Sequence, residues 1–459
     1  MITPLRSVLR LLPVAVSVSA LAAQAPGDST LLAWPRAVEQ TVQLRLRTDA
    51  GKLWGARLDS VPLFLVADQR ALLSADPRSE GFTTGADGWW AGALPTGLVV
   101  ANTAVAWAGR TWAMMMLPLA SDAMASSRLV IHERWHVIQP RILPLPAYNQ
   151  FDPGAELLDQ PDGRIWLRLE WAALVAALDA RPGSMAERAA VKAALTFRAM
   201  RYSRATAGER LRERLLDLGE GMAEYTGWKL SGNSAAELSQ VLRTRAPASR
   251  SFGRSFAYFT GPGYGYLLDR HASGWRTALR TRLDLQTLLA ATLGRDGTNV
   301  ADWLQGAGNQ VKLAAASEQL GRAYGLEQIR REENDRWAEM SRKIGELRER
   351  FLKGPTLRIP VGGMGFAFDP TNSTSLGADG TVYGYVEWKG ADGAILSSEG
   401  GTFANAARNE LRVSVDSAKF TTGVLPETTR WAGAGWSLTL PAGWRVEAAG
   451  ASWLLTPPK

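Results

Sequence analysis

The 459-residue chain contains no cysteine and only three histidines. Without cysteine it forms no disulfide and carries no lipid attached through a cysteine, so its stability has to come from a packed core, helped at most by a metal. Hydrophobic residues make up 46% of the chain, which is ordinary for a globular protein with a full core. The length indicates two or three domains.

The sequence also lacks the charge pattern of a nucleic-acid-binding protein. Its formal charge of +8 arises from 52 basic and 44 acidic residues that are mixed along the chain. No basic cluster with interleaved aromatic residues stands out, so we expect no nucleic-acid partner and interpret the charge as a contribution to solubility.

Long apolar runs are absent except at the N-terminus. The run Leu11–Ala23 follows two arginines and ends in small residues, which predicts a secretory signal peptide over residues 1–23. A membrane anchor is the alternative, but the run is short for a spanning helix. We therefore expect no membrane span after signal removal, and a periplasmic or secreted protein.

Residues 24–118 are predicted to be a β-rich region. Several segments alternate apolar and polar residues or form short apolar runs, as strands do. They are Val42–Arg47, Val61–Val66, Asn102–Trp107 and Arg110–Leu117. The last two flank Ala108-Gly109, a two-residue connection that is typical of a tight hairpin.

Residues 119–354 are predicted to form a helical core, and residues 355–459 an all-β domain, so the expected fold class is α+β. The helical segments are Ile165–Leu178, Met185–Tyr202, Glu209–Leu230, Asn233–Leu242, Ser255–His271 and Leu326–Leu352. Gly354-Pro355 marks the expected boundary. Beyond it, β-prone runs such as Thr381–Trp388 and Glu410–Val415 alternate with turn residues, which predicts a sandwich or a barrel.

A helical stretch with apolar flanks contains His132-Glu133-Arg134-Trp135-His136, which fits the pattern HExxH. Residues four apart lie on one face of a helix, so His132 and His136 can bind one zinc ion. Glu133 can then act as general base toward a water on that metal. Pro140 is expected to end the helix. Two of the chain's three histidines lie here, which argues against a chance match.

A catalytic zinc site needs a third protein ligand. The segment Leu218–Tyr225 resembles the E-G-x-A-x-Y segment of the gluzincin zinc metallopeptidases, particularly the aminopeptidase N family. The resemblance implies that Glu220 completes the zinc site and that Glu224 orients a zinc-bound imidazole. Gly219 and Gly221 indicate that another backbone, expected to be the metal-binding helix, approaches closely.

A shorter resemblance concerns the residue that stabilises the oxyanion during peptide hydrolysis. Tyr258-Phe259-Thr260-Gly261 is similar to the Y-E-K-G segment of the aminopeptidase N family at its first and last residues. It implies that Tyr258 hydrogen-bonds the oxyanion of the tetrahedral intermediate. Tyr264, Tyr266 and His271 are alternatives, and a packed aromatic helix face is the structural interpretation.

The chain departs from the aminopeptidase N pattern in two places. The segment between His136 and Glu220 is far longer than in that family, so the helices of residues 165–202 are expected to form an inserted subdomain. The strand Trp112–Met116 lacks the glutamate of the G-x-M-E-N motif, which grips a free amino group, so aminopeptidase specificity is not implied.

These patterns predict an exported zinc metallopeptidase, a hydrolase that acts on a peptide or protein substrate with a metal-activated water. The strand Trp112–Met116 is expected to pair with an extended substrate by strand addition. The alternative is a non-catalytic exported binding or envelope protein that retains a gluzincin-like fold. A structural protein with an accidental motif is the third interpretation.

Overall fold

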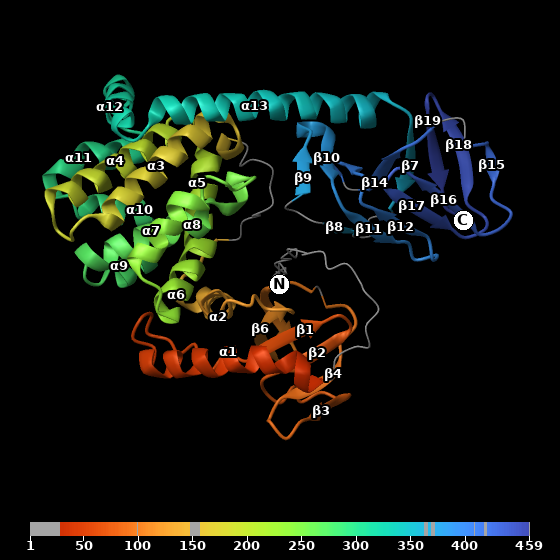
Figure 1. Cartoon of the computed structure of the whole chain (residues 1–459), viewed down its shortest axis with the longest axis horizontal. Coiled ribbons are helices and arrows are strands. Elements are labelled where there is room, and N and C mark those ends of the chain that lie inside the picture. Colours follow the sequence, from red (N-terminus) through yellow and green to blue (C-terminus); the bar gives the residue numbers. More distant parts are fainter. Residues whose placement is uncertain are drawn as a thin grey trace, which may run out of the picture. The chain divides into compact units, whose positions relative to one another are not determined.

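The computed structural model describes residues 28–98, 100–146, 157–361, 366–368, 372–407, 409–416 and 420–458. Helices fill the middle of the chain and two sheets its C-terminal region, so the fold is α+β, as predicted (Figure 1). The predicted signal peptide, residues 1–23, lies outside the described residues. No helix among those residues combines the length and the apolar character that crossing a membrane requires.

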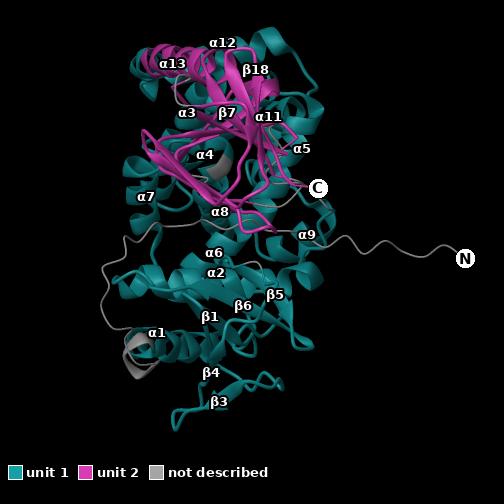
Figure 2. Ribbon diagram, turned by 90° about the vertical axis from the view of Figure 1, so that its right-hand side faces the viewer, with its two compact units in different colours: residues 1–13, 22–333 teal, residues 14–21, 334–459 magenta. Residues whose placement is uncertain are grey.

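The chain divides into two compact units, which Figure 2 colours separately. Among the described residues the first unit ends at Glu333 and the second begins at Asn334, inside helix α13 (Leu326–Arg348). The predicted boundary at Gly354-Pro355 falls instead after the π-helical turn η4 (Glu349–Lys353), which extends that helix. Composition marks where a helix ends, whereas tertiary contacts decide where a unit ends.

The first unit contains a six-stranded sheet with the order β3-β4-β2-β1-β6-β5. Its strands are β1 (Leu63–Ala67), β2 (Arg70–Leu73), β3 (Phe82–Thr84), β4 (Trp90–Ala93), β5 (Thr103–Trp107) and β6 (Arg110–Met116). The predicted hairpin between β5 and β6 is confirmed, and both Ala108 and Gly109 have the positive φ that its two-residue turn requires. At β6 both faces of the sheet are buried, since Met115 faces the main core and Met114 a smaller aromatic cluster. That explains the unbroken apolar run in β6.

The predicted strand Val42–Arg47 is wrong, because this segment lies inside helix α1 (Asp28–Asp49). Val42 and Leu46, four residues apart, are buried, whereas Leu44 between them is 69% exposed. The short window looked alternating because a few residues of a helical stripe resemble a period of two.

The segments predicted within residues 165–271 are helical, and further helices lie in residues 275–323, where no individual helix was predicted. The helices are α2 (Ala123–Ile142), α3 (Pro161–Asp179), α4 (Met185–Tyr202), α5 (Ala207–Leu216), α6 (Met222–Ser231), α7 (Ala235–Thr244), α8 (Phe252–His271), α9 (Trp275–Arg282), α10 (Leu285–Ala291), α11 (Thr298–Leu304) and α12 (Gln310–Ala323), with a 3₁₀ turn η3 (Gly294–Gly297). A π-helical turn, η2 (Asp217–Gly221), joins α5 to α6 within the single helix expected there. Pro140 does not end α2, which continues to Ile142, because the Leu143 amide still donates to the Gln139 carbonyl at 2.7 Å.

The second unit holds the end of α13, η4 and two sheets. The eight-stranded sheet has the order β15-β18-β19-β7-β14-β13-β10-β9, and the five-stranded sheet the order β16-β17-β12-β11-β8. Their strands are β7 (Thr356–Pro360), β8 (Ala367–Phe368), β9 (Ser373–Ser375), β10 (Gly380–Tyr383), β11 (Val386–Lys389), β12 (Ile395–Ser398), β13 (Thr402–Asn405), β14 (Glu410–Ser414), β15 (Gly423–Val424), β16 (Thr429–Gly433), β17 (Trp436–Leu440), β18 (Arg445–Ala449) and β19 (Ser452–Thr456), with a 3₁₀ turn η6 (Gly377–Asp379) before β10. The strand expected over Thr381–Trp388 is therefore two strands, and they belong to different sheets.

Candidate metal centre

Helix α2 carries the HExxH motif and contacts α1, α6 and the strands β5 and β6. The two residues between Glu133 and His136 anchor the helix on the side away from the histidines. Arg134 pairs with Glu39 of α1 at 2.6 Å, and the ring of Trp135 packs on Trp54 with centroids 4.5 Å apart. These buried anchors fix the rotation of α2, so that His132 and the next histidine face α6 and η2.

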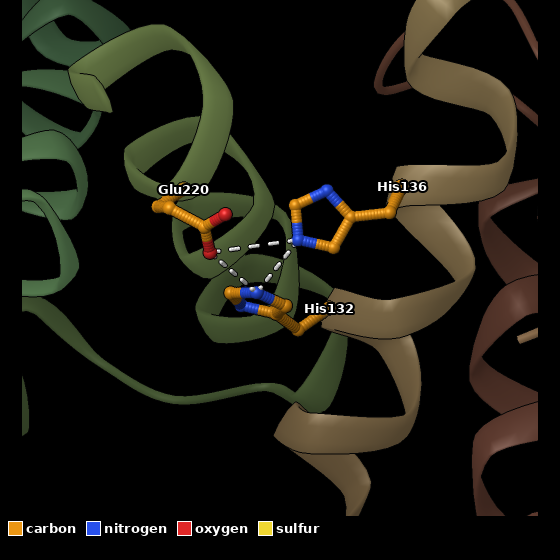
Figure 3. A group of neighbouring side chains, drawn as sticks. All are labelled: His132, His136 and Glu220. Atoms are coloured by element: carbon orange, nitrogen blue, oxygen red, sulfur yellow. Dashed lines mark hydrogen bonds and ion pairs between the residues drawn. The ribbon is translucent and has the colours of Figure 1, made fainter. Parts of the chain in front are cut away.

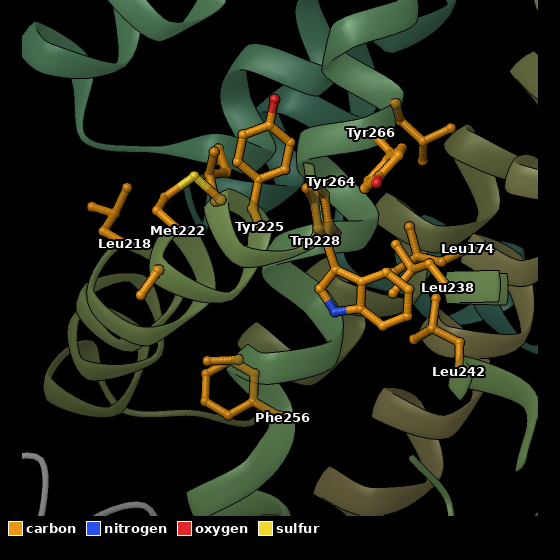
Figure 4. Close-up of a cluster of buried hydrophobic side chains, with 14 of the residues drawn as sticks. Leu174, Leu218, Met222, Tyr225, Trp228, Leu238, Leu242, Phe256, Tyr264 and Tyr266 are labelled. Atoms are coloured by element: carbon orange, nitrogen blue, oxygen red, sulfur yellow. The ribbon is translucent and has the colours of Figure 1, made fainter. Parts of the chain in front are cut away.

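The third predicted ligand, Glu220, lies in the π-helical turn η2. Such a turn adds a residue to the helix and redirects the side chains around it, and it occurs often at functional sites. Leu218 and Met222, on either side of Glu220, are buried in the core (Figure 4). Glu220 is thereby turned toward α2.

Close backbone contacts set the helices around the cluster. A Cβ on Gly227 of α6 would lie 2.8 Å from the Arg128 carbonyl oxygen of α2, and a Cβ on Gly261 of α8 would lie 2.3 Å from the Cα of Gly221. The backbone that approaches Gly221 is therefore α8, and the prediction that it is the metal-binding helix is wrong. Glycines show that a close approach exists but do not identify its partner.

The three predicted ligands meet at one point, as Figure 3 shows. The Nε2 atoms of His132 and His136 are 3.0 Å apart, and they lie 3.4 and 3.6 Å from the Glu220 Oε2 atom. Two imidazole nitrogens and one carboxylate oxygen form a donor set that zinc accepts, with a fourth position left for water in catalytic sites.

The electrostatics of this cluster favour positive charge at its centre. Burial opposes protonation of His132, but Glu220 and Glu224 outweigh it and hold its pKa well above the ordinary 6.5. Burial likewise opposes charge on His136, whose pKa is nevertheless raised, chiefly by Glu220. Burial alone would raise the pKa of Glu220, yet the two imidazoles hold it well below the ordinary value. A divalent cation supplies the same positive charge without protons on the rings.

The other nitrogen of His132 is held by Glu224. His132 Nδ1 lies 3.0 Å from the Glu224 Oε2 atom. The Oε1 atom of the same carboxylate accepts from Trp228 at 3.0 Å and faces Arg128 at 3.1 Å. With Nδ1 acting as donor, the Nε2 lone pair of His132 is free for a metal.

Sequence reasoning missed the residue that holds His136. The Gln139 Oε1 atom lies 3.0 Å from His136 Nδ1, and its Nε2 donates to the carbonyl oxygens of Leu218 and Gly219 at 2.9 and 3.2 Å. The available signal was spacing, since residues three apart are neighbours on a helix surface. Arg128, which supports Glu224, was missed as well.

Glu133 is only 4% exposed and follows His132 directly. Its Oε2 atom has no hydrogen-bond partner among the described residues. Burial raises its pKa above the ordinary 4.5, although the imidazoles of His132 and His136 oppose the shift. An orphaned carboxylate oxygen at this position suits a group that binds and deprotonates water.

Tyr258 contacts the cluster from α8. Its hydroxyl donates to Glu220 Oε2 at 2.7 Å, and its ring is stacked on His132 with centroids 5.6 Å apart. The three alternatives have other partners: Tyr264 donates to Glu170, Tyr266 to the Asn233 carbonyl, and His271 faces Glu187. Among these four candidates, only Tyr258 therefore lies at the cluster.

The strand β6 does not have the free edge that strand addition requires. β6 is paired with β1 on one side and with β5 on the other. The expectation that Trp112–Met116 pairs with substrate is therefore wrong, because the sequence does not show which strand of a hairpin lies outside. β5 ends the sheet as described, and α2 contacts it.

Comparison with models of known protein families, with curated proteins and with solved structures found no match. The structure by itself shows an α+β chain that gathers a partly buried His-His-Glu cluster between a helix under a sheet and a π-helical turn.

Proposed function

We propose that the chain is an exported zinc metallopeptidase of gluzincin type. The observation that carries the proposal is the convergence of the Nε2 atoms of His132 and His136 on Glu220 Oε2, with distances of 3.0 to 3.6 Å. These residues come from two helices far apart in the sequence, which argues against an accidental motif.

In this proposal His132, His136 and Glu220 would hold a zinc ion, which would polarise the peptide carbonyl and lower the pKa of water. Glu133 takes a proton from the attacking water and passes it to the leaving nitrogen. Tyr258, which is 37% exposed, would turn its single O–H from Glu220 to the oxyanion at the edge of the cluster. An extended peptide pairs with the outer edge of β5 by strand addition, since β6 is covered.

Hydrolysis of a peptide library before and after metal removal tests the proposal. The zinc-loaded protein is expected to cleave peptides, the chelated protein to lose this activity, and re-addition of zinc to restore it. Equal cleavage by the chelated and the loaded protein would rule out a metallopeptidase. Zinc binding without cleavage of any peptide would favour the non-catalytic exported protein.

A further inference from the structure

Gln139 makes contacts with two elements that each present a metal ligand. It lies on α2, one turn after His136, and its side chain reaches η2, which carries Glu220. It is 7% exposed, so its amide is largely removed from water and has to find partners within the protein.

All the contacts of this amide serve the cluster. Oε1 can only accept, so its 3.0 Å contact with His136 Nδ1 requires that the neutral ring carry its proton on Nδ1. That tautomer leaves Nε2 unprotonated and directed at Glu220. The same logic applies to His132, whose Nδ1 faces Glu224.

The amide nitrogen of Gln139 contacts the turn that carries Glu220. It donates to the carbonyl oxygens of Leu218 and Gly219, the two residues before Glu220. A π-helical turn breaks the regular hydrogen-bond ladder. The Gly219 carbonyl accepts from the Met222 amide as well, so Gln139 adds a donor from outside the turn. One donor shared by two successive carbonyls holds this turn at a defined distance from α2.

We propose that Gln139 is a positioning residue that fixes the tautomer of His136 and at the same time locks the turn that carries Glu220. The inference rests on the proposed metal centre. In it, Gln139 links the helix α2, which carries the two histidines, to the turn η2, which carries Glu220. A glutamine suits this role because one planar group offers both an acceptor and a donor. A carboxylate or a thioether offers at most one of them.

The test compares Gln139→Met with a matched loss of a buried glutamine elsewhere. Gln286 on α10 is 1% exposed and donates to the Tyr202 hydroxyl at 2.9 Å, away from the cluster. Gln286→Met therefore removes a similar buried hydrogen bond from the same unit. We expect Gln139→Met to bind zinc about 10- to 100-fold more weakly than the wild type and Gln286→Met to bind it as the wild type does.

A third variant separates the two tasks. Gln139→Glu keeps an acceptor for His136 Nδ1 but loses the donor to the two carbonyls. It should preserve the tautomer and still weaken metal binding. The visible absorption spectrum of the cobalt-substituted proteins should change for both Gln139 variants, which a general loss of stability does not produce.

The ¹⁵N shifts of the His136 ring report the tautomer without any metal. In the metal-free protein, at a pH that leaves the ring neutral, we expect the Nδ1–H form in the wild type and in Gln139→Glu, and a shift toward Nε2–H in Gln139→Met. Equal zinc affinity of Gln139→Met and Gln286→Met would overturn the inference and leave the metallopeptidase proposal standing. An unchanged His136 tautomer in Gln139→Met would also overturn the inference. If neither the wild type nor any variant binds zinc, the proposed function itself fails.

Discussion

Glu224 holds the imidazole of His132 through Nδ1 at 3.0 Å, from a position one helical turn beyond Glu220. Glu220, the proposed third metal ligand, and Glu224, which contacts His132, therefore lie on one continuous helical segment. Because Arg128 and Trp228 engage the other oxygen of Glu224, this carboxylate has little freedom to rotate. The geometry of His132 thus depends on the packing of α6 against α2.

Replacing Glu224 with glutamine should weaken zinc binding by about 10- to 100-fold, because the neutral amide is a poorer acceptor for His132 and loses the charge interaction with Arg128. Competition with a chelator of known affinity measures the effect. Glu237→Gln on the neighbouring helix α7 is the control, since Glu237 is exposed and caps that helix. Equal losses in the two variants would show that Glu224 has no specific role.

Glu133→Gln should keep the metal and lose hydrolysis, with kcat lowered by about 10²- to 10⁴-fold. The amide has nearly the same shape but cannot accept a proton. Because burial raises the pKa of Glu133, its charge is unfavourable in the metal-free protein, and the neutral variant should be no less stable. Zinc content, thermal unfolding and peptide cleavage are measured on the same sample. Cleavage at the wild-type rate would exclude Glu133 as the base.

Gly261→Ala should destabilise the first unit by about 1–3 kcal/mol, because its Cβ would collide with the backbone of η2. The nearest atom, the Cα of Gly221, would be 2.3 Å away. The displaced turn should also bind zinc more weakly. Gly208→Ala is the control, since a Cβ there would meet only the Thr206 Oγ1 atom at 4.0 Å. Chemical denaturation that shows equal stability for the two variants would contradict the close contact.

A buried charge network that includes Asp217 of η2 should make stability depend on pH. Arg198 lies 2.6 Å from Asp217 and 3.0 Å from Glu170, while Arg201 also pairs with Glu170 and lies 2.8 Å from Glu213. The three carboxylates outnumber the two guanidinium groups. Burial, opposed by Arg198, raises the pKa of Asp217 from 3.8 to about 7.

The sign of this effect follows from proton binding. Below the unfolded pKa of 3.8 both states hold the proton, and between 3.8 and about 7 the folded state holds it more tightly. The stabilising contribution of protonated Asp217 is therefore complete at acid pH and is lost as the pH rises through about 7. Denaturation curves at a series of pH values give the free energy of unfolding. Between pH 3.8 and about 7 it should fall more steeply with pH in the wild type than in Asp217→Asn. Parallel dependence on pH would show that Asp217 does not titrate there.

The sequence predicts those parts of the structure that depend on local spacing. Helix α4 has the predicted bounds, Met185–Tyr202, because apolar periodicity and the capping residue Ser184 are local signals. The pairing of His132 with His136 is local in the same sense. Glu220 could be chosen only through a motif resemblance, because nothing in its own spacing relates it to α2.

What the sequence does not predict depends on tertiary contacts. Gln139 acts through the carbonyls of a π-helical turn, and the glycines of that turn do not show that its carbonyls meet a side chain from α2. The identity of α1 as a helix depends on burial against α2, including the buried pair of Glu39 and Arg134. The choice of β5 as the outer strand likewise follows from the parallel pairing of β6 with β1, which only the assembled sheet reveals.

Elemental analysis of the purified protein after exposure to zinc and removal of the excess addresses the metal centre most directly. The wild type should retain one zinc ion per chain, and His132→Ala and Glu220→Ala should retain none while keeping the helical circular dichroism of the wild type. A wild-type protein that is folded and yet holds no zinc, or a His132→Ala variant that holds as much as the wild type, would contradict a metal centre at His132, His136 and Glu220.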